Sequence, residues 1–242
     1  ENRQIQVSYT PDAPAPAVVE LTMGLMYTLL RNVHEANIQL HKGQWKRHLG
    51  KRLTECSIGI IGAGRVGSKV IKNLQALGCK NILYHDKNVR LKEEANGSLT
   101  FADRDEIYKN TDIVSLHLPL DSETKNLITI KEIELMKKDS FLINTARGGI
   151  INENDLSVAL EKKLIAGAAI DVFEDEPYNG KLVNHENCIL TSHMGSMTID
   201  CRSRMEIEAT EEAIRYIKGF KLQGLVPEDE YKIQRNGSNN NE

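Results

Sequence analysis

The stretch that decides the fold is Cys56-Ser57-Ile58-Gly59-Ile60-Ile61-Gly62-Ala63-Gly64-Arg65-Val66-Gly67. Its apolar part, Ile58–Ile61, predicts a buried parallel strand, and a helical pattern follows over residues 68–77. Between them, Gly62 permits a tight turn and Gly64 leaves the backbone open to a diphosphate, while Gly67 lets the helix pack closely on the sheet. The start of that helix offers free N–H groups and a positive dipole end to the same anion.

A second apolar strand, residues 81–85, ends at Asp86, which lies nineteen residues beyond Gly67. A carboxylate in this place accepts hydrogen bonds from an adenosine ribose and repels a 2′-phosphate. The pattern therefore predicts NAD in preference to NADP, although Lys87 and Arg90 leave some room for NADP. The alternative is that Asp86 only caps the next turn. We favour the cofactor because strand, turn, helix, strand and acid follow in the required order.

Strands and helices alternate along the rest of the chain. We expect strands at residues 111–118, 140–144, 165–172 and 188–191, and helices at 130–138, from Asn152 through Lys162, and at 198–218. Asp155 is placed to complete a capping-box-like arrangement in the second of these helices. The alternation predicts an α/β fold with a Rossmann-type doubly wound parallel sheet and helices on both faces.

A long helical pattern without proline covers residues 17–44 at the N-terminal side of this unit. Apolar residues recur at three- to four-residue spacing and extend beyond one stripe, so the helix requires burial on more than one side. We therefore expect a long packing or dimerisation helix, covered by the second subunit of a homodimer or by a missing domain. The basic run at 46–52 is interpreted as a solvated linker.

Composition excludes several classes of partner and location. The 242 residues are 40% hydrophobic and 27% charged, with a net charge of −3, which argues against nucleic acid or an anionic membrane as partner. The four cysteines are widely spaced and form no metal-ligand pairs, so we expect free thiols in a cytoplasmic protein without a metal site. We find no signal peptide and no membrane-spanning run, and the start at Glu1 indicates a fragment or a processed form.

Four polar side chains follow strands of the expected sheet, where ligands of open parallel sheets collect. Arg147 can bind a substrate carboxylate through two hydrogen bonds. His193 can exchange a proton with a carbonyl oxygen, and Glu176 beside it would favour the imidazolium and orient the ring. Asp171 can hold the amide of a nicotinamide. These residues predict an oxidoreductase that transfers hydride.

Each of these residues also has a simpler interpretation. Arg147 alone is typical of a surface ion pair, His193 alone of a structural hydrogen bond, and the acidic run at 174–176 of a solvated loop. Their combination around one cofactor cleft favours the catalytic interpretation. His117 also ends a strand, and we interpret it as a lining or structural residue.

Five ordered segments resemble the D-isomer-specific 2-hydroxyacid dehydrogenases. They are Gly62–Gly67, Val114–Leu120, Asn144–Gly149, Ala168–Pro177 and Thr191–Ser196 within a resemblance from about Val7 to Lys218. The resemblance implies that Arg147, Glu176 and His193 are catalytic. It implies contacts with NAD from Gly62, Gly64, Arg65, Val66, Gly67, Asp86, Pro119, Thr145, Ala146, Arg147, Asp171, His193 and Gly195, with Arg65 and Val66 at the diphosphate, Asp86 at the ribose, and Thr145, Ala146 and Asp171 at the nicotinamide.

Two departures from the family qualify what the resemblance implies. Ser192 stands where the family commonly has proline, which could loosen the loop that holds His193. The family carries most of a substrate domain before the equivalent of Val7. The resemblance therefore implies a dinucleotide-binding domain over 17–218, with 1–16 and 219–242 as hinge and tail remnants of an absent substrate domain. The polar end of the chain is expected to be disordered.

Three functions remain open at this point. The first is an NAD-dependent enzyme that interconverts a small 2-oxo acid and a D-2-hydroxy acid, with Glu176 favouring it over the related formate dehydrogenases. The second is an NAD(H)-sensing dimeric interaction protein that resembles the family's transcriptional corepressors. The third is a bare NAD-binding module, because a fragment that lacks one wall of the cleft is expected to turn over poorly or not at all.

Overall fold

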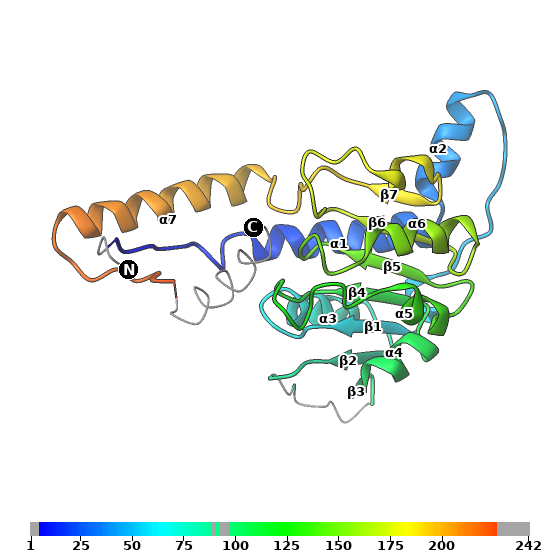
Figure 1. Ribbon diagram of the computed structural model, residues 1–242, viewed down its shortest axis with the longest axis horizontal. Coiled ribbons are helices and arrows are strands. Elements are labelled where there is room, and N and C mark those ends of the chain that lie inside the picture. Colours follow the sequence, from blue (N-terminus) through cyan, green and yellow to red (C-terminus); the bar gives the residue numbers. More distant parts are fainter. Residues whose placement is uncertain (1–4, 89–90, 92–96, 227–242) are drawn as a thin grey trace.

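The computed structural model describes residues 5–88, 91 and 97–226. Its centre is a sheet of parallel strands in the order β3-β2-β1-β4-β5-β6-β7 (Figure 1). The strands are β1 (Ile58–Ile61), β2 (Ile82–His85), β3 (Leu99–Phe101), β4 (Ile113–Leu116), β5 (Phe141–Asn144), β6 (Gly167–Ile170) and β7 (Cys188–Leu190). The order reverses between β1 and β4, which confirms the predicted Rossmann-type sheet.

Helices connect the strands. They are α1 (Ala15–Leu30), α2 (Val33–His41), α3 (Gly67–Ala76), α4 (Arg104–Asn110), α5 (Ile130–Leu135), α6 (Glu153–Glu161) and α7 (Ile199–Ile217), with short 3-10 helices η1 (Leu53–Glu55) and η2 (Lys181–Asn184). The predicted elements are present with shifted ends. Neither β3 nor α4 was predicted, because each is too short to show a clear period.

The core lies on both faces of the sheet. On one face, α1 and α3 pack against residues such as Ile58 and Ile60 of β1. On the other face, α4, α5 and α6 pack against residues such as Ile61. Successive side chains of a strand point to opposite faces, so this alternation follows directly from the apolar run of β1.

The structure corrects the prediction of one continuous helix over residues 17–44. The chain leaves the helical path after α1, and Asn32 adopts a left-handed conformation with φ of 51° before α2 begins. Asparagine tolerates this conformation better than most residues, so a short polar residue breaks the helix. Every residue of α2 is at least partly exposed, and the following loop exposes Trp45 and Leu49.

The helix predicted at 130–138 ends at Leu135, and the capping box that was expected at the helix from Asn152 is found at α5 instead. The capping box lies at Thr129 and Glu132, whose side chains bond to each other's backbone N–H groups. At α6, the Asn152 side chain accepts from the backbone N–H of Asp155, as an N-cap does. The Asp155 carboxylate instead accepts from the N–H of Ile130, so it joins two helices rather than completing the predicted box.

Helix α7 projects from the body of the molecule, and an N-terminal segment runs back beside it (Figure 1). The backbone N–H of Tyr9 donates to the carbonyl of Gly224 at 2.9 Å, and Ser8 forms an antiparallel bridge with Leu225. The buried Glu212 carboxylate accepts from the N–H groups of Gln223 and Gly224. The tail expected to be disordered lies, from residue 227 on, outside the described residues. Among the helices described, none is long and apolar enough to cross a membrane.

Candidate active site

The glycine turn lies at the switch point of the sheet, between the carboxyl ends of β1 and β4. Gly62 has φ of 96°, and its N–H donates to the carbonyl of His85 at 2.8 Å. A Cβ on Gly62 would collide with the carbonyl oxygen of His117, and one on Gly67 would collide with the carbonyl oxygen of Gly62. The turn therefore needs glycine at both positions, because a side chain would push the helix and β4 away.

The turn and the residues around it fit the diphosphate and ribose of NAD. A Cβ at Gly64 would meet no atom within 4 Å, so the backbone there lies open to a ligand. Oδ2 of Asp86 accepts from the N–H of Ala63 at 2.6 Å, which holds the carboxylate across the turn at the end of β2. A ribose whose diphosphate lies on this turn would meet that carboxylate.

The other predicted cofactor residues differ in their exposure and in the elements that they contact. Val66 is the N-cap residue of α3. The Arg65 guanidinium pairs with Asp12 at 3.0 Å, so its charge is directed to a carboxylate of the N-terminal segment. Pro119 is exposed after β4, whereas Thr145 is buried against α1.

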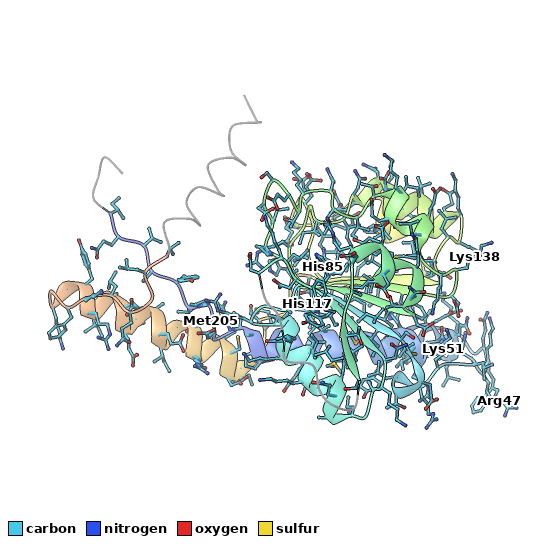
Figure 2. The ribbon with its side chains drawn as sticks, turned by 90° about the horizontal axis from the view of Figure 1, so that it is seen from below. Arg47, Lys51, His85, His117, Lys138 and Met205 are labelled. Atoms are coloured by element: carbon cyan, nitrogen blue, oxygen red, sulfur yellow. The ribbon has the colours of Figure 1, made fainter. Side chains whose placement is uncertain are left out.

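His117 and His85, both labelled in Figure 2, bring their backbone carbonyl groups close to Gly62 of the glycine turn. Nε2 of His117 lies 3.0 Å from Oγ of Ser115, and its Nδ1 atom is buried. Burial lowers the pKa of His117 to about 4. The ring is therefore neutral near pH 7, which agrees with its interpretation as a lining or structural residue.

His193 and Glu176 meet beside the sheet edge. Nδ1 of His193 lies 2.8 Å from Oε2 of Glu176, and the N–H of Phe173 donates to Oε1 of the same carboxylate at 3.0 Å. Burial raises the pKa of the Glu176 carboxyl, but the hydrogen bonds from His193 and from Phe173 outweigh it and lower the pKa below its ordinary value. Because Nδ1 faces the carboxylate, Nε2 is the nitrogen left for a substrate.

The loop that carries His193 is fastened by Asp171, which follows β6. The His193 N–H donates to the backbone carbonyl of Asp171 at 2.8 Å, while the residue itself has φ of 50°. The buried Asp171 carboxylate accepts from the hydroxyl of Thr191 at 2.6 Å and from the N–H groups of Met194 and Gly195 at 2.9 and 3.0 Å. These bonds hold the histidine in a conformation that non-glycine residues seldom adopt.

The loop that carries Arg147 follows β5 and lies against the loop that carries Glu176. The buried Asn144 side chain accepts from the N–H of Ala146 at 3.0 Å and donates to the carbonyl of Arg147 at 2.9 Å. A Cβ on Gly148 would collide with the carbonyl of Phe173, so the two loops touch through backbone atoms. The Arg147 side chain is exposed, and Nη1 donates to the carbonyl of Ala146 at 2.7 Å.

A pocket of about 600 Å³ adjoins the His193–Glu176 pair. Its walls include Phe173, Tyr178 and Leu190, and the rings of Phe173 and Tyr178 stack with centroids 4.2 Å apart. The pocket is lined mostly by apolar side chains and has the His193–Glu176 pair at one side. This arrangement suits a small organic substrate. Within the described residues, no cluster of His, Cys, Asp or Glu is arranged to hold a metal ion.

Several residues that build this site were not predicted from the sequence. The side chains of Asn144 and Thr191 were visible only as parts of quoted segments, although polar residues after strands are the signal that marks such positions. Thr22 contacts Thr145 from α1, and nothing in its helical surroundings indicated this contact.

Comparison with known proteins finds relatives that match most of the chain. Residues 23–195 match the family model described as "D-isomer specific 2-hydroxyacid dehydrogenase, NAD binding domain". A glyoxylate reductase of Thermofilum pendens is 37% identical over 241 residues, covering 96% of this chain and 71% of that protein. A hydroxypyruvate reductase of Thermotoga maritima is 35% identical over 221 residues, covering 89% of this chain and 71% of that protein. The crystal structure of a D-lactate dehydrogenase from Aquifex aeolicus, complexed with NAD and lactic acid, superposes with a TM-score of 0.82 at 28% identity, covering 90% of this chain and 71% of that one.

Proposed function

The chain belongs to the D-isomer specific 2-hydroxyacid dehydrogenases through their NAD-binding domain, and we propose from this premise that the protein interconverts a small 2-oxo acid and a D-2-hydroxy acid. The observation that carries the proposal is the pair of His193 and Glu176, whose Nδ1 and Oε2 atoms lie 2.8 Å apart beside an apolar pocket. NADH, when bound, supplies the hydride for reduction of the substrate.

His193 is the proposed acid and base. Its Nδ1 donates to the Glu176 carboxylate, which orients the ring and leaves Nε2 to give a proton to the substrate's carbonyl oxygen. In the opposite direction the neutral ring takes the proton from the hydroxyl group. The bonds from Asp171 to residues 191–195 keep the ring in place during both transfers.

Arg147 is the proposed ligand of the substrate carboxylate. A guanidinium can form two parallel hydrogen bonds to a carboxylate, and this side chain is exposed beside the loop of Glu176. We propose that it turns from the carbonyl of Ala146 to the substrate on binding. Asp86 favours NAD over NADP in this proposal, because its carboxylate would repel a 2′-phosphate.

We further propose that residues 17–218 form the dinucleotide-binding domain and that 1–16 and 219–242 belong with a substrate-binding domain. Several apolar side chains on and after α7 support this, because they are exposed in the described chain: Ile207, Ile214, Ile217 and Phe220. The four free cysteines suit a reducing compartment such as the cytoplasm.

A substitution of His193 tests the proposal in the full-length protein. His193→Gln should lower kcat for pyruvate, glyoxylate, hydroxypyruvate or 3-phosphohydroxypyruvate by roughly 10²- to 10⁴-fold, the usual contribution of a general acid. His34→Gln, at an exposed position of α2, serves as the matched control. NADH oxidation at an undiminished rate in the His193 variant would rule out the acid–base role.

A second candidate is an NAD(H)-sensing interaction protein that dimerises through α1, α2 and the loop after them. The arm formed by residues 33–49 favours it, because Val33, Leu40, Trp45 and Leu49 are exposed apolar residues. Light scattering with and without NADH separates the candidates. A mass that doubles with cofactor in a protein without turnover supports the sensor, and an unchanged mass beside measurable turnover supports the enzyme.

A further inference from the structure

Helix α1 carries one buried hydroxyl group that reaches the loop of Arg147. Oγ1 of Thr22 lies 2.8 Å from Oγ1 of Thr145, although 123 residues separate them in the chain. Thr22 is 0% exposed and Thr145 is 6% exposed. A hydroxyl contact closed off from water in this way is costly to break, because neither partner can replace it with a solvent molecule.

The direction of this hydrogen bond follows from a second contact. Oγ1 of Thr22 lies 2.8 Å from the backbone carbonyl of Val18, and a carbonyl oxygen can only accept. The single hydroxyl proton of Thr22 is therefore used in that bond. Thr145 must then donate its own proton to Thr22, so the hydroxyl of Thr22 acts as the acceptor that fixes Thr145.

Thr145 begins the loop whose third residue is Arg147. The Asn144 side chain ties this loop to the end of β5 by its bonds to Ala146 and Arg147. The hydroxyl bond to Thr22 links the loop to α1, a separate element of the fold. Because the Arg147 side chain is exposed, its direction depends on where this backbone is held.

The same helix also contacts the loop of His193. A Cβ on Gly195 would lie 3.1 Å from a methyl carbon of Val18, so α1 packs closely on that loop one turn away from Thr22. Helix α1 is therefore a common support for the two loops that carry the proposed carboxylate ligand and the proposed acid. A shift of the Arg147 loop relative to α1 is also a shift relative to His193.

We propose that Thr22 is a positioning residue for Arg147: its buried hydroxyl accepts the Thr145 proton and so holds the Arg147 loop at the distance from His193 that a bound 2-oxo acid requires. The inference rests on the proposed function, since it needs Arg147 to bind the substrate carboxylate. Thr22 itself touches neither substrate nor cofactor in this proposal.

The test compares variants of the full-length protein in steady-state kinetics with NADH. Thr22→Val keeps the shape of the side chain but removes the acceptor, and it should raise the KM for the 2-oxo acid roughly fivefold, the effect of one lost hydrogen bond. The Kd for NADH, measured by fluorescence titration, should change less than the KM, because most of the expected NAD contacts lie outside the Arg147 loop. Thr22→Ser retains the hydroxyl and should restore the KM.

Thr28→Val is the matched control. Thr28 lies on the same helix and its hydroxyl donates to the carbonyl of Gly24 at 2.7 Å, so the same substitution removes an equivalent helix bond without a contact to the Arg147 loop. It should leave the KM unchanged. If Thr22→Val does not fold, Thr22→Ala removes the same acceptor and replaces it in the comparison.

Arg147→Lys separates this inference from the proposed function. A raised KM in Arg147→Lys beside an unchanged KM in Thr22→Val would overturn the positioning role alone. An unchanged KM in Arg147→Lys would overturn the role of Arg147 and with it the role of Thr22. If Thr22 acts through Arg147, adding Thr22→Val to Arg147→Lys should raise the KM by less than twofold. A fivefold higher KM in the double variant than in Arg147→Lys would overturn the inference.

Discussion

Nδ1 of His193 lies 2.8 Å from Oε2 of Glu176, although the two residues come from loops that follow different strands. Each partner is held separately. The Glu176 carboxylate accepts a second bond from the N–H of Phe173, and the His193 backbone is bonded to Asp171. Protein contacts alone therefore hold the pair, and they give the imidazole a fixed orientation.

Replacing Glu176 should weaken catalysis by releasing the ring of His193. In Glu176→Gln one carboxylate oxygen becomes an NH₂ group, so the ring loses part of the acceptor set that orients Nε2. We expect kcat for reduction of the 2-oxo acid to fall at least about tenfold. Glu174→Gln, in the same loop but paired with Lys125 at 3.9 Å, should leave kcat unchanged. A wild-type kcat in Glu176→Gln would contradict this role.

Asp171 should matter for stability as well as for activity. In Asp171→Asn one carboxylate oxygen becomes an NH₂ group that faces a backbone or hydroxyl donor. Leaving one buried donor without an acceptor costs about 1–3 kcal/mol, so the free energy of unfolding in urea should fall by this amount. Asp175→Asn, on the exposed acidic loop, is the control and should change it little. Equal unfolding curves for both variants would show that the bonds to residues 191–195 contribute little.

Gly64→Ala should separate folding from cofactor binding. Because a Cβ at this position meets no protein atom within 4 Å, the melting temperature should stay close to that of the wild type. The same methyl group would occupy the space where a diphosphate approaches, so the Kd for NADH should rise at least about tenfold. Gly24→Ala also adds a methyl group in open space, on helix α1, and should leave the Kd unchanged. NADH binding of normal strength in Gly64→Ala would place the diphosphate elsewhere.

His117 should make the fold sensitive to mild acid. Burial lowers its pKa to about 4 from the ordinary value of 6.5, so below pH 6.5 the unfolded chain binds a proton that the folded chain does not. The resulting stability is fully present above pH 6.5 and is lost as the pH falls towards 4. We therefore expect the free energy of unfolding in urea to fall less between pH 7 and pH 4.5 in His117→Gln than in the wild type. His34→Gln, which changes an exposed residue, should lose as much free energy of unfolding as the wild type. An equal loss in all three proteins would contradict the effect assigned to His117.

The amino-acid sequence by itself determined the order of the elements and the place of the glycine turn. These features are local: a run such as Ile58–Ile61 has few alternatives to a buried strand, and Gly62 and Gly67 meet a steric requirement of the turn itself. The break at Asn32 is also local, but a single left-handed residue inside an apolar helical pattern gives too weak a signal to be predicted.

Only the tertiary structure decided how the site is held together. The sequence indicated Arg147, Glu176 and His193 as candidates, but the contact of Thr22 with Thr145 joins residues 123 positions apart. Asp171 likewise directs its carboxylate to the loop of His193, and these contacts were not predicted from the sequence. Such hydrogen bonds depend on which side chains the packing of α1 and the sheet brings within 3 Å of each other, and no local pattern of residues encodes that distance.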